Sequence, residues 1–301
     1  MADTSTILRG ALNYGIHTPI TISRSGVYRL DGPLNASAES TALTISANNV
    51  TLDLAGNTIS GGATGIAVTG NNIAIKNGTI QNMSTAGIHI SGTKCQSEAL
   101  DVINSGTGFL IQNTNSTSIT NCRALGSTSA GFSLIASYTT SITNCQALNT
   151  NGTTQSAYGF VSQNGYGNIF EQCTAQNTQT NSTISNSLAA GFLLAHESAS
   201  TIASSQAYDT LSLTTTAAAY GIATNLPTDA TLNLLNSQAL GAGVLSAAWS
   251  PDGRFLAIVI INQIRIYQWE PSSASLQEIV PARTAYTGTV IPFATIAWSP
   301  D

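Results

Sequence analysis

Apolar residues alternate with polar residues over short runs along most of this chain. Two stretches, Gly108 to Leu125 and Gly131 to Leu148, repeat almost letter for letter, 23 residues apart. Each has a glycine followed by a large apolar residue and, further on, the sequence Ser-Ile-Thr-Asn-Cys. Short alternating runs bounded by Gly, Asn and Ser predict β-strands joined by tight turns, and a repeat of this length predicts a solenoid of stacked coils.

The repeat can be followed along the chain from one coil to the next. Each coil begins with a glycine; the residue after it is large and apolar, and the residue two positions further on usually is as well. These glycines are Gly65, Gly87, Gly108, Gly131, Gly159, Gly191 and Gly221. Because strand alternation places both apolar residues on one face, we expect them to point inward. Stacked coils would then build a ladder from Phe109, Phe132, Phe160 and Phe192.

A second buried column follows later in each coil. Ile119 and Cys122 are three residues apart, so plain alternation cannot turn both inward. A one-residue bend at Asn121 resolves this, since Asn tolerates the left-handed backbone conformation. The bend predicts that Ile119, Cys122 and Ala124 face inward while Arg123 faces outward.

The bend also places cysteines of successive coils in one column: Cys122, Cys145 and Cys173. We expect them to be small buried thiols, which behave as apolar side chains. Disulfides between neighbouring coils are the alternative, because such coils lie about 4.8 Å apart. The sequence leaves open the redox state of these three cysteines and of Cys95.

The segment Asn49-Val50-Thr51-Leu52-Asp53-Leu54-Ala55-Gly56-Asn57-Thr58-Ile59 resembles the first coils of the pectate lyase-like superfamily, and Ile119-Thr120-Asn121-Cys122 resembles its coil repeat. The resemblance implies an all-β chain with a right-handed parallel β-helix over residues 20–243 and an N-terminal lead-in or cap at 1–19. The superfamily includes lyases, hydrolases, adhesins and inert scaffolds, so the resemblance implies no single activity.

The composition changes near residue 244. Trp249-Ser250-Pro251-Asp252 suits a turn between two strands, and Trp298-Ser299-Pro300-Asp301 repeats it 49 residues later. This pattern resembles the repeats of WD40-type propellers. We therefore expect residues 244–301 to form a partial β-propeller blade that contacts other proteins. One blade cannot close a propeller, so we expect the chain to be a truncated part of a longer protein. The alternative is that the blade packs on the last coil and caps its open edge.

Charge is scarce: Asp, Glu, Lys and Arg make up 8% of the chain, against about 25% in an ordinary soluble protein. The net charge of -5 offers no basic patch for phosphates, which argues against nucleic acid as a partner. No apolar run is long enough to span a membrane, and the first residues show no secretory signal. The polar composition favours an extracellular or cell-surface location, and the compartment stays open.

The coils differ in length, and the extra residues fall at one corner, in the segments 149–158, 177–190 and 209–220. Neighbouring insertions are expected to stand side by side and form a wall, beside which solenoids bind extended ligands. Tyrosines in or near these segments can stack on sugar rings. The candidate ligand-binding residues are Tyr138, Tyr158, Tyr166 and Tyr220. The alternative is that the loops are Thr- and Ser-rich decoration and the tyrosines cover the corner.

Catalytic candidates are weak. A lyase of this superfamily would need clustered acids and a basic residue, and a hydrolase would need paired carboxylates, but the acidic residues occupy different coil positions. The weak candidates are Glu171, Glu197, Asp209 and Arg123. The histidines His17, His89 and His196 lack metal-ligand spacing, so we expect neither a metal site nor a cofactor.

These observations favour a non-catalytic β-solenoid that binds or displays a polysaccharide or another extended polymer and is joined to a protein-interaction propeller. One alternative is a carbohydrate-active enzyme, either a polysaccharide lyase or a glycoside hydrolase. A second is a purely structural scaffold. The sequence does not identify the ligand.

Overall fold

The computed structural model describes residues 6–8, 19–38, 40–152, 155–184, 187–212, 218–225, 244–249, 255–260, 263–270 and 275–284, with the backbone alone in 6–8, at 218 and from 224 onward. Every regular element in these ranges is a β-strand. No helix in them is long and apolar enough to cross a membrane. The chain divides into two compact units, residues 1–233 and 234–301.

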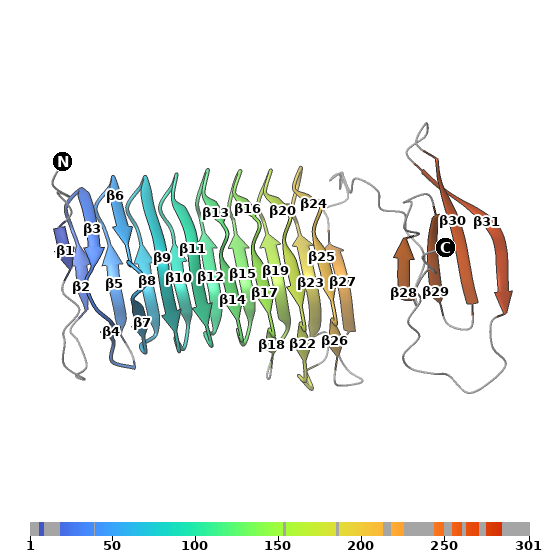
Figure 1. The fold of residues 1–301 in the computed structure, drawn as a ribbon, viewed down its shortest axis with the longest axis horizontal. Helices are drawn as coiled ribbons and strands as arrows, with labels where there is room; N and C mark the ends of the chain where they lie inside the picture. Colours follow the sequence, from blue (N-terminus) through green and yellow to red (C-terminus); the bar gives the residue numbers. More distant parts are fainter. Residues whose placement is uncertain are drawn as a thin grey trace. The chain divides into compact units, whose positions relative to one another are not determined.

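The first unit is a stack of coils (Figure 1). One face of each coil contributes a strand to a parallel sheet that contains nine strands in the described ranges, in the order β2-β5-β8-β10-β12-β15-β19-β23-β27. Their bounds are β2 Ile20–Ile22, β5 Thr41–Ile45, β8 Thr64–Val68, β10 Ala86–Ile90, β12 Thr107–Gln112, β15 Ala130–Ile135, β19 Ala157–Gln163, β23 Leu188–Ala195 and β27 Ala218–Asn225. Strands that neighbour in this sheet belong to successive coils, as the repeat predicts.

The other faces form a second parallel sheet. It contains β1 Thr6–Leu8, β3 Gly26–Leu30, β4 Leu34–Asn35, β6 Val50–Asp53, β7 Thr58–Ser60, β9 Ile73–Gln81, β11 Gln96–Ile103, β13 Ser118–Thr120, β14 Arg123–Leu125, β16 Ser141–Thr143, β17 Gln146–Leu148, β20 Ile169–Glu171, β21 Thr174–Gln176, β24 Thr201–Ala203 and β25 Gln206–Tyr208. From β13 onward each coil contributes two short strands, because a bend separates them.

The interior is built from in-register columns of apolar side chains. Phe109, Phe132, Phe160 and Phe192 are buried and pair across β12, β15, β19 and β23. Their rings stack with centroids 4.7 to 4.8 Å apart, which is the spacing of neighbouring coils. The predicted phenylalanine ladder is confirmed.

The bend between the two short strands, which we call corner B, is the predicted one-residue turn. Asn121 and Asn144 have φ of 55° and 52°, and the Asn144 side-chain amide donates to Asn121 Oδ1 over 2.6 Å. The bend turns Cys122, Cys145 and Cys173 inward, where all are buried free thiols. The expectation of buried thiols is confirmed over the disulfide alternative.

The insertions lie together at another corner, corner C, which follows β14, β17, β21 and β25. Short strands from three insertions pair in parallel: β18 Asn151–Gly152, β22 Gln179–Thr180 and β26 Leu211–Ser212. They lie along one edge of the stack (Figure 1). The insertions therefore stand side by side, as predicted.

The described part of the second unit is an antiparallel sheet of β28 Val244–Trp249, β29 Phe255–Ile260, β30 Gln263–Glu270 and β31 Ser275–Thr284, paired in sequence order. The repeated segment Trp298 to Asp301 lies outside the described residues. The propeller stays a prediction.

Candidate functional site

Tight turns connect the nine-stranded sheet to the next strands of each coil and form what we call corner A. It comprises residues 113–117, 136–140, 164–168 and 196–200, which follow β12, β15, β19 and β23. In each turn the first and fourth residues have positive φ. The second and fifth residues are buried, so the third residue stands on the outside of the corner.

Tyr138 and Tyr166 occupy that outside position in neighbouring coils. They are parallel bridge partners, and their side chains are 45% and 53% exposed. Bridge partners in adjacent coils lie about 4.8 Å apart, so the two side chains leave the corner side by side. Corner A therefore presents a pair of exposed aromatic rings.

An exposed polar cluster adjoins this pair. Asn115 is the bridge partner of Tyr138 in the preceding coil, and its Oδ1 accepts hydrogen bonds of 2.8 Å from both Ser116 Oγ and Thr139 Oγ1. The two hydroxyls lie 3.3 Å from each other. The interpretation of the sequence missed Asn115, Ser116 and Thr139. Aligning Asn115 with Tyr138 across the 23-residue repeat could have found them.

Tyr158 and Tyr220 lie elsewhere, at the beginning of strands β19 and β27. They share a column of the nine-stranded sheet with Ala190 between them. Tyr158 is half-buried and packs against an apolar cluster that includes Ala130, Val161 and Leu193, whereas Tyr220 is exposed. The candidate tyrosines thus form two groups at opposite ends of the strands. Tyr138 and Tyr166 are direct neighbours in their group, whereas one coil separates Tyr158 from Tyr220.

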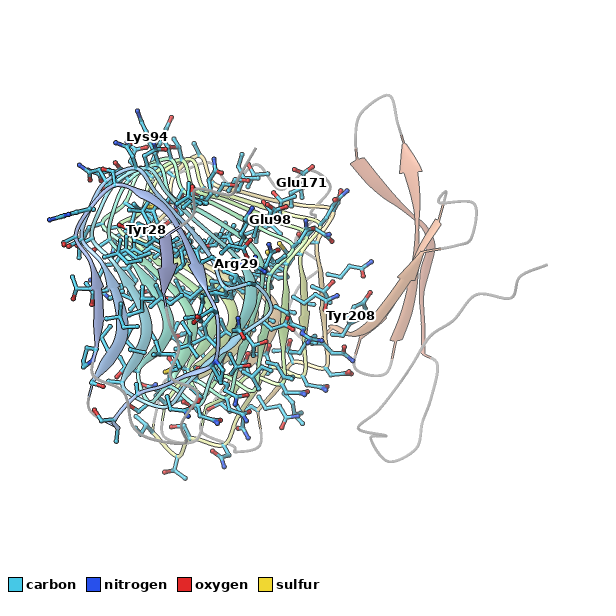
Figure 2. The ribbon with its side chains drawn as sticks, turned by 60° about the vertical axis from the view of Figure 1, so that its left-hand side comes forward. Tyr28, Arg29, Lys94, Glu98, Glu171 and Tyr208 are labelled. Atoms are coloured by element: carbon cyan, nitrogen blue, oxygen red, sulfur yellow. The ribbon has the colours of Figure 1, made fainter. Side chains whose placement is uncertain are left out.

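The charged candidates are separated around the coil. Glu171 points outward from β20 in the same column as Glu98, and Figure 2 shows both on the outside of the stack. Asp209 follows β25 and begins corner C, in the column of Asn149 and Asn177. Glu197 lies inside corner A and is 1% exposed. These carboxylates therefore occupy three different columns.

Arg123 already has a partner. Its guanidinium donates to both carboxylate oxygens of Asp101 in the preceding coil, with Nε to Oδ1 at 3.1 Å and Nη2 to Oδ2 at 2.9 Å. The pair is bidentate and partly exposed. Arg123 thus faces outward, as predicted, and its charge is balanced within the chain.

His89 is half-buried on the outer face of β10. Burial lowers its pKa, and a hydrogen bond with Gln112 partly offsets this effect. His17 lies outside the described residues, and His196 is exposed in corner A. Among the residues with described side chains, no three or more His, Cys, Asp or Glu are grouped to hold a metal ion.

Comparison with known proteins agrees with this architecture. The family model described as "Right handed beta helix region" matches residues 41–207, more than half of the 301 residues, and the chain belongs to this family. No curated protein sequence matches the chain.

Three similar solved structures are the mannuronan C-5 epimerase AlgE6 A-module of Azotobacter vinelandii, a pectin methylesterase in complex with a hexasaccharide, and the Dettilon tailspike protein. The first is 14% identical, with 62% of this chain and 70% of that chain covered and a TM-score of 0.43. The second is 11% identical, with 83% and 99% covered and a TM-score of 0.39. The third is 10% identical, with 88% and 70% covered and a TM-score of 0.35. At these identities and TM-scores the three structures carry no argument about this chain, and the family assignment rests on the family model alone.

Proposed function

We propose that the β-helix is a non-catalytic module that binds an extended polysaccharide along corner A. The observation that carries the proposal is the pair of exposed rings of Tyr138 and Tyr166 in adjacent coils, next to the hydrogen-bonded cluster around Asn115. Aromatic faces cover the apolar faces of sugar rings, while amide and hydroxyl groups bond to sugar hydroxyls. A column that continues from coil to coil suits a ligand that is itself a repeating chain.

The positions of the charged residues support the non-catalytic form of this proposal. Acid–base cleavage of a glycosidic bond needs two carboxyl groups on either side of that bond. Glu171 and Asp209 lie on different parts of the coil, Glu197 is buried, and Arg123 is paired with Asp101. Glu171, Asp209 and Arg123 therefore lie away from the exposed tyrosine pair, and Glu197 is buried beneath it.

We also propose that the second unit is part of a propeller that contacts other proteins. The repeat of Trp-Ser-Pro-Asp in the sequence and the sequential antiparallel pairing of β28 to β31 support this part of the proposal. A pull-down with residues 234–301 deleted would test it, since a partner bound through this unit should be lost.

The binding proposal is tested by retention on a panel of immobilised neutral and acidic polysaccharides. Replacing both Tyr138 and Tyr166 by Ala should weaken retention roughly tenfold or more, because each aromatic contact contributes about 0.5–1.5 kcal/mol. The matched control is Tyr208→Ala, which removes a tyrosine that is 47% exposed on the outer face of β25. Equal retention of the double variant and this control would reject the proposal.

The enzymatic alternative is tested on the same polymers. Ultraviolet absorbance reports the unsaturated uronate that a lyase releases, and a reducing-end assay reports hydrolysis. We expect no product from the full chain, and product on any polymer would replace the proposal with the carbohydrate-active enzyme.

A further inference from the structure

The buried carboxylate of Glu197 is hydrogen-bonded through both oxygens. Oε1 accepts the backbone N–H of Gly165 over 2.7 Å, and Oε2 accepts the hydroxyl of Ser200 over 2.6 Å and the amide of Asn168 over 3.2 Å. Gly165 and Asn168 belong to the preceding coil. A side chain of one coil thus holds the corner A turn of the coil before it.

That turn carries Tyr166 and has little stiffness of its own. Tyr166 stands between Gly165 and Gly167, and glycine restricts the backbone least of all residues. In the neighbouring turn, the equivalent positions around Tyr138 hold Ser137 and Thr139. The turn of Tyr166 therefore depends more on contacts from outside itself.

Gly165 also makes the space that the carboxylate occupies. A Cβ there would lie 2.7 Å from Glu197 Oε1, 2.6 Å from Asn168 Nδ2 and 2.4 Å from the carbonyl oxygen of Ser137. All three distances are too short for a real Cβ, so a larger residue at 165 would displace the Glu197 carboxylate or the turn. Glycine at 165 and glutamate at 197 in the next coil therefore fit each other in size.

Asn168 extends the network to the turn of Tyr138. Its Nδ2 donates to the carbonyl oxygen of Ser137 at 2.9 Å and lies 3.1 Å from Ser162 Oγ, while its Oδ1 accepts the N–H of Thr140 at 2.9 Å. A buried polar network whose members are hydrogen-bonded makes a segment rigid. Glu197 and Asn168 together link the backbones beneath both exposed tyrosines.

We propose that Glu197 is a positioning residue that holds the turn of Tyr166 in the conformation that binds polymer. This inference rests on the proposed function, because it assigns Glu197 a role through Tyr166. Glu197 has no direct contact with the ligand, since it is buried beneath the corner. A preorganised turn raises affinity because less backbone entropy is lost on binding.

The test compares Glu197→Gln with Glu197→Leu in the full chain. Gln can still accept the Gly165 N–H and donate to Ser200 Oγ, and it loses the 3.2 Å hydrogen bond from the Asn168 amide, which keeps its acceptor at Ser137. Leu has similar bulk and no acceptor. The matched control is Glu171→Gln, which removes the same charge from an exposed position outside the network. Ser200→Ala is the second variant should the Leu variant fail to fold. It removes the hydroxyl that donates to Glu197 Oε2 over 2.6 Å and that also accepts the backbone N–H of Asn168 over 3.0 Å.

Two readouts are measured. Hydrogen–deuterium exchange is read at the Gly165 N–H, which Glu197 accepts, and needs no ligand. In the Leu variant this exchange should be faster by about tenfold, as expected for a lost buried hydrogen bond. Polysaccharide retention should fall in the Leu variant to the level of Tyr166→Ala and recover in the Gln variant. Ser200→Ala should shift both readouts in the same direction by a smaller factor.

Unchanged exchange in both Leu and Ala variants would overturn the inference. Faster exchange with full retention, while Tyr166→Ala loses retention, would also overturn it, because Tyr166 would then bind without the support of Glu197. Full retention by Tyr166→Ala would overturn the proposed function at Tyr166, and the exchange measurement would still support or reject anchoring of the turn by Glu197.

Discussion

At the residue scale, glycines at the starts of the coils let the backbone of one coil approach the next. A Cβ at Gly159 would lie 2.6 Å from the Cβ of Ala175 and 2.6 Å from the carbonyl oxygen of Gly191. Real Cβ atoms do not come this close to other atoms, so position 159 accepts only glycine unless the neighbouring coil shifts. Among the described residues, a Cβ at Gly221 would lie no closer than 3.7 Å to another atom, the Cβ of Ala207.

Gly159→Ala should therefore lower the free energy of unfolding by about 1–3 kcal/mol, the usual cost of overpacking. Gly221→Ala, the matched control in the same coil position, should change it by about 0.5 kcal/mol or less. Urea unfolding of both variants measures the difference. Equal stability of the two variants would show that the coils can move apart at no cost.

At the element scale, the short strands around corner B align a column of thiols. The N–H of Cys122 donates to the Sγ of Cys145 over 3.4 Å, and the thiol of Cys173 donates to the carbonyl oxygen of Ile142 over 3.3 Å. The side-chain hydrogen bond with the Cys122 thiol, together with burial, raises the pKa of Cys145 despite the opposing backbone N–H of Cys122, and burial raises the pKa of Cys173 to about 11. Cys145 and Cys173 are therefore protonated at neutral pH and are held as apolar side chains.

This column makes stability depend on pH on the alkaline side. An unfolded chain ionises its cysteines near pH 9.0, whereas folded Cys173 keeps its proton to about pH 11. The stabilisation from the raised pKa is complete below pH 9 and is lost as the pH rises from there toward 11. Above pH 9, Cys173 alone should reduce the free energy of unfolding by about 1.4 kcal/mol per pH unit.

Urea unfolding between pH 7 and 10.5, with a reductant present, measures this dependence. Cys173→Ala is the control, and its stability should fall less steeply above pH 9. Rapid labelling of Cys173 in the native chain by a thiol reagent at pH 8 would contradict the assignment, because a protonated buried thiol reacts slowly.

At the scale of the whole molecule, the chain has two compact units with different strand pairing. Residues 1–233 hold parallel strands, and the described strands of residues 234–301 are antiparallel. In a solenoid each coil contacts its immediate neighbours, so the first unit should keep its structure without the second.

Limited proteolysis with proteinase K or thermolysin should release a β-helix fragment that ends near residue 234–244 and retains polysaccharide binding. Trypsin is the informative control, since the sequence has no Lys or Arg between Arg123 and Arg254. Cleavage scattered through the coils from the start of digestion would argue against two independent units.

The sequence predicted the coil period, the phenylalanine ladder, the bend at Asn121, the thiol column and the grouping of the insertions. These features follow from positions that recur in successive coils, and strand alternation separates inside from outside without reference to any distant residue. For this reason Phe109, Cys122 and Asn121 could be placed correctly from one short segment and its copy.

Only the tertiary structure decided where the outward and irregular residues lie and what they contact. It placed Tyr138 and Tyr166 together at corner A, in the turns that follow β15 and β19, and it placed Tyr158 and Tyr220 at the other end of the strands, near the starts of β19 and β27. It also showed that Glu197, a catalytic candidate in the sequence, is buried and accepts a hydrogen bond from the backbone N–H of Gly165. That contact depends on the space left by Gly165 in a different coil, and no periodic pattern records such a pairing.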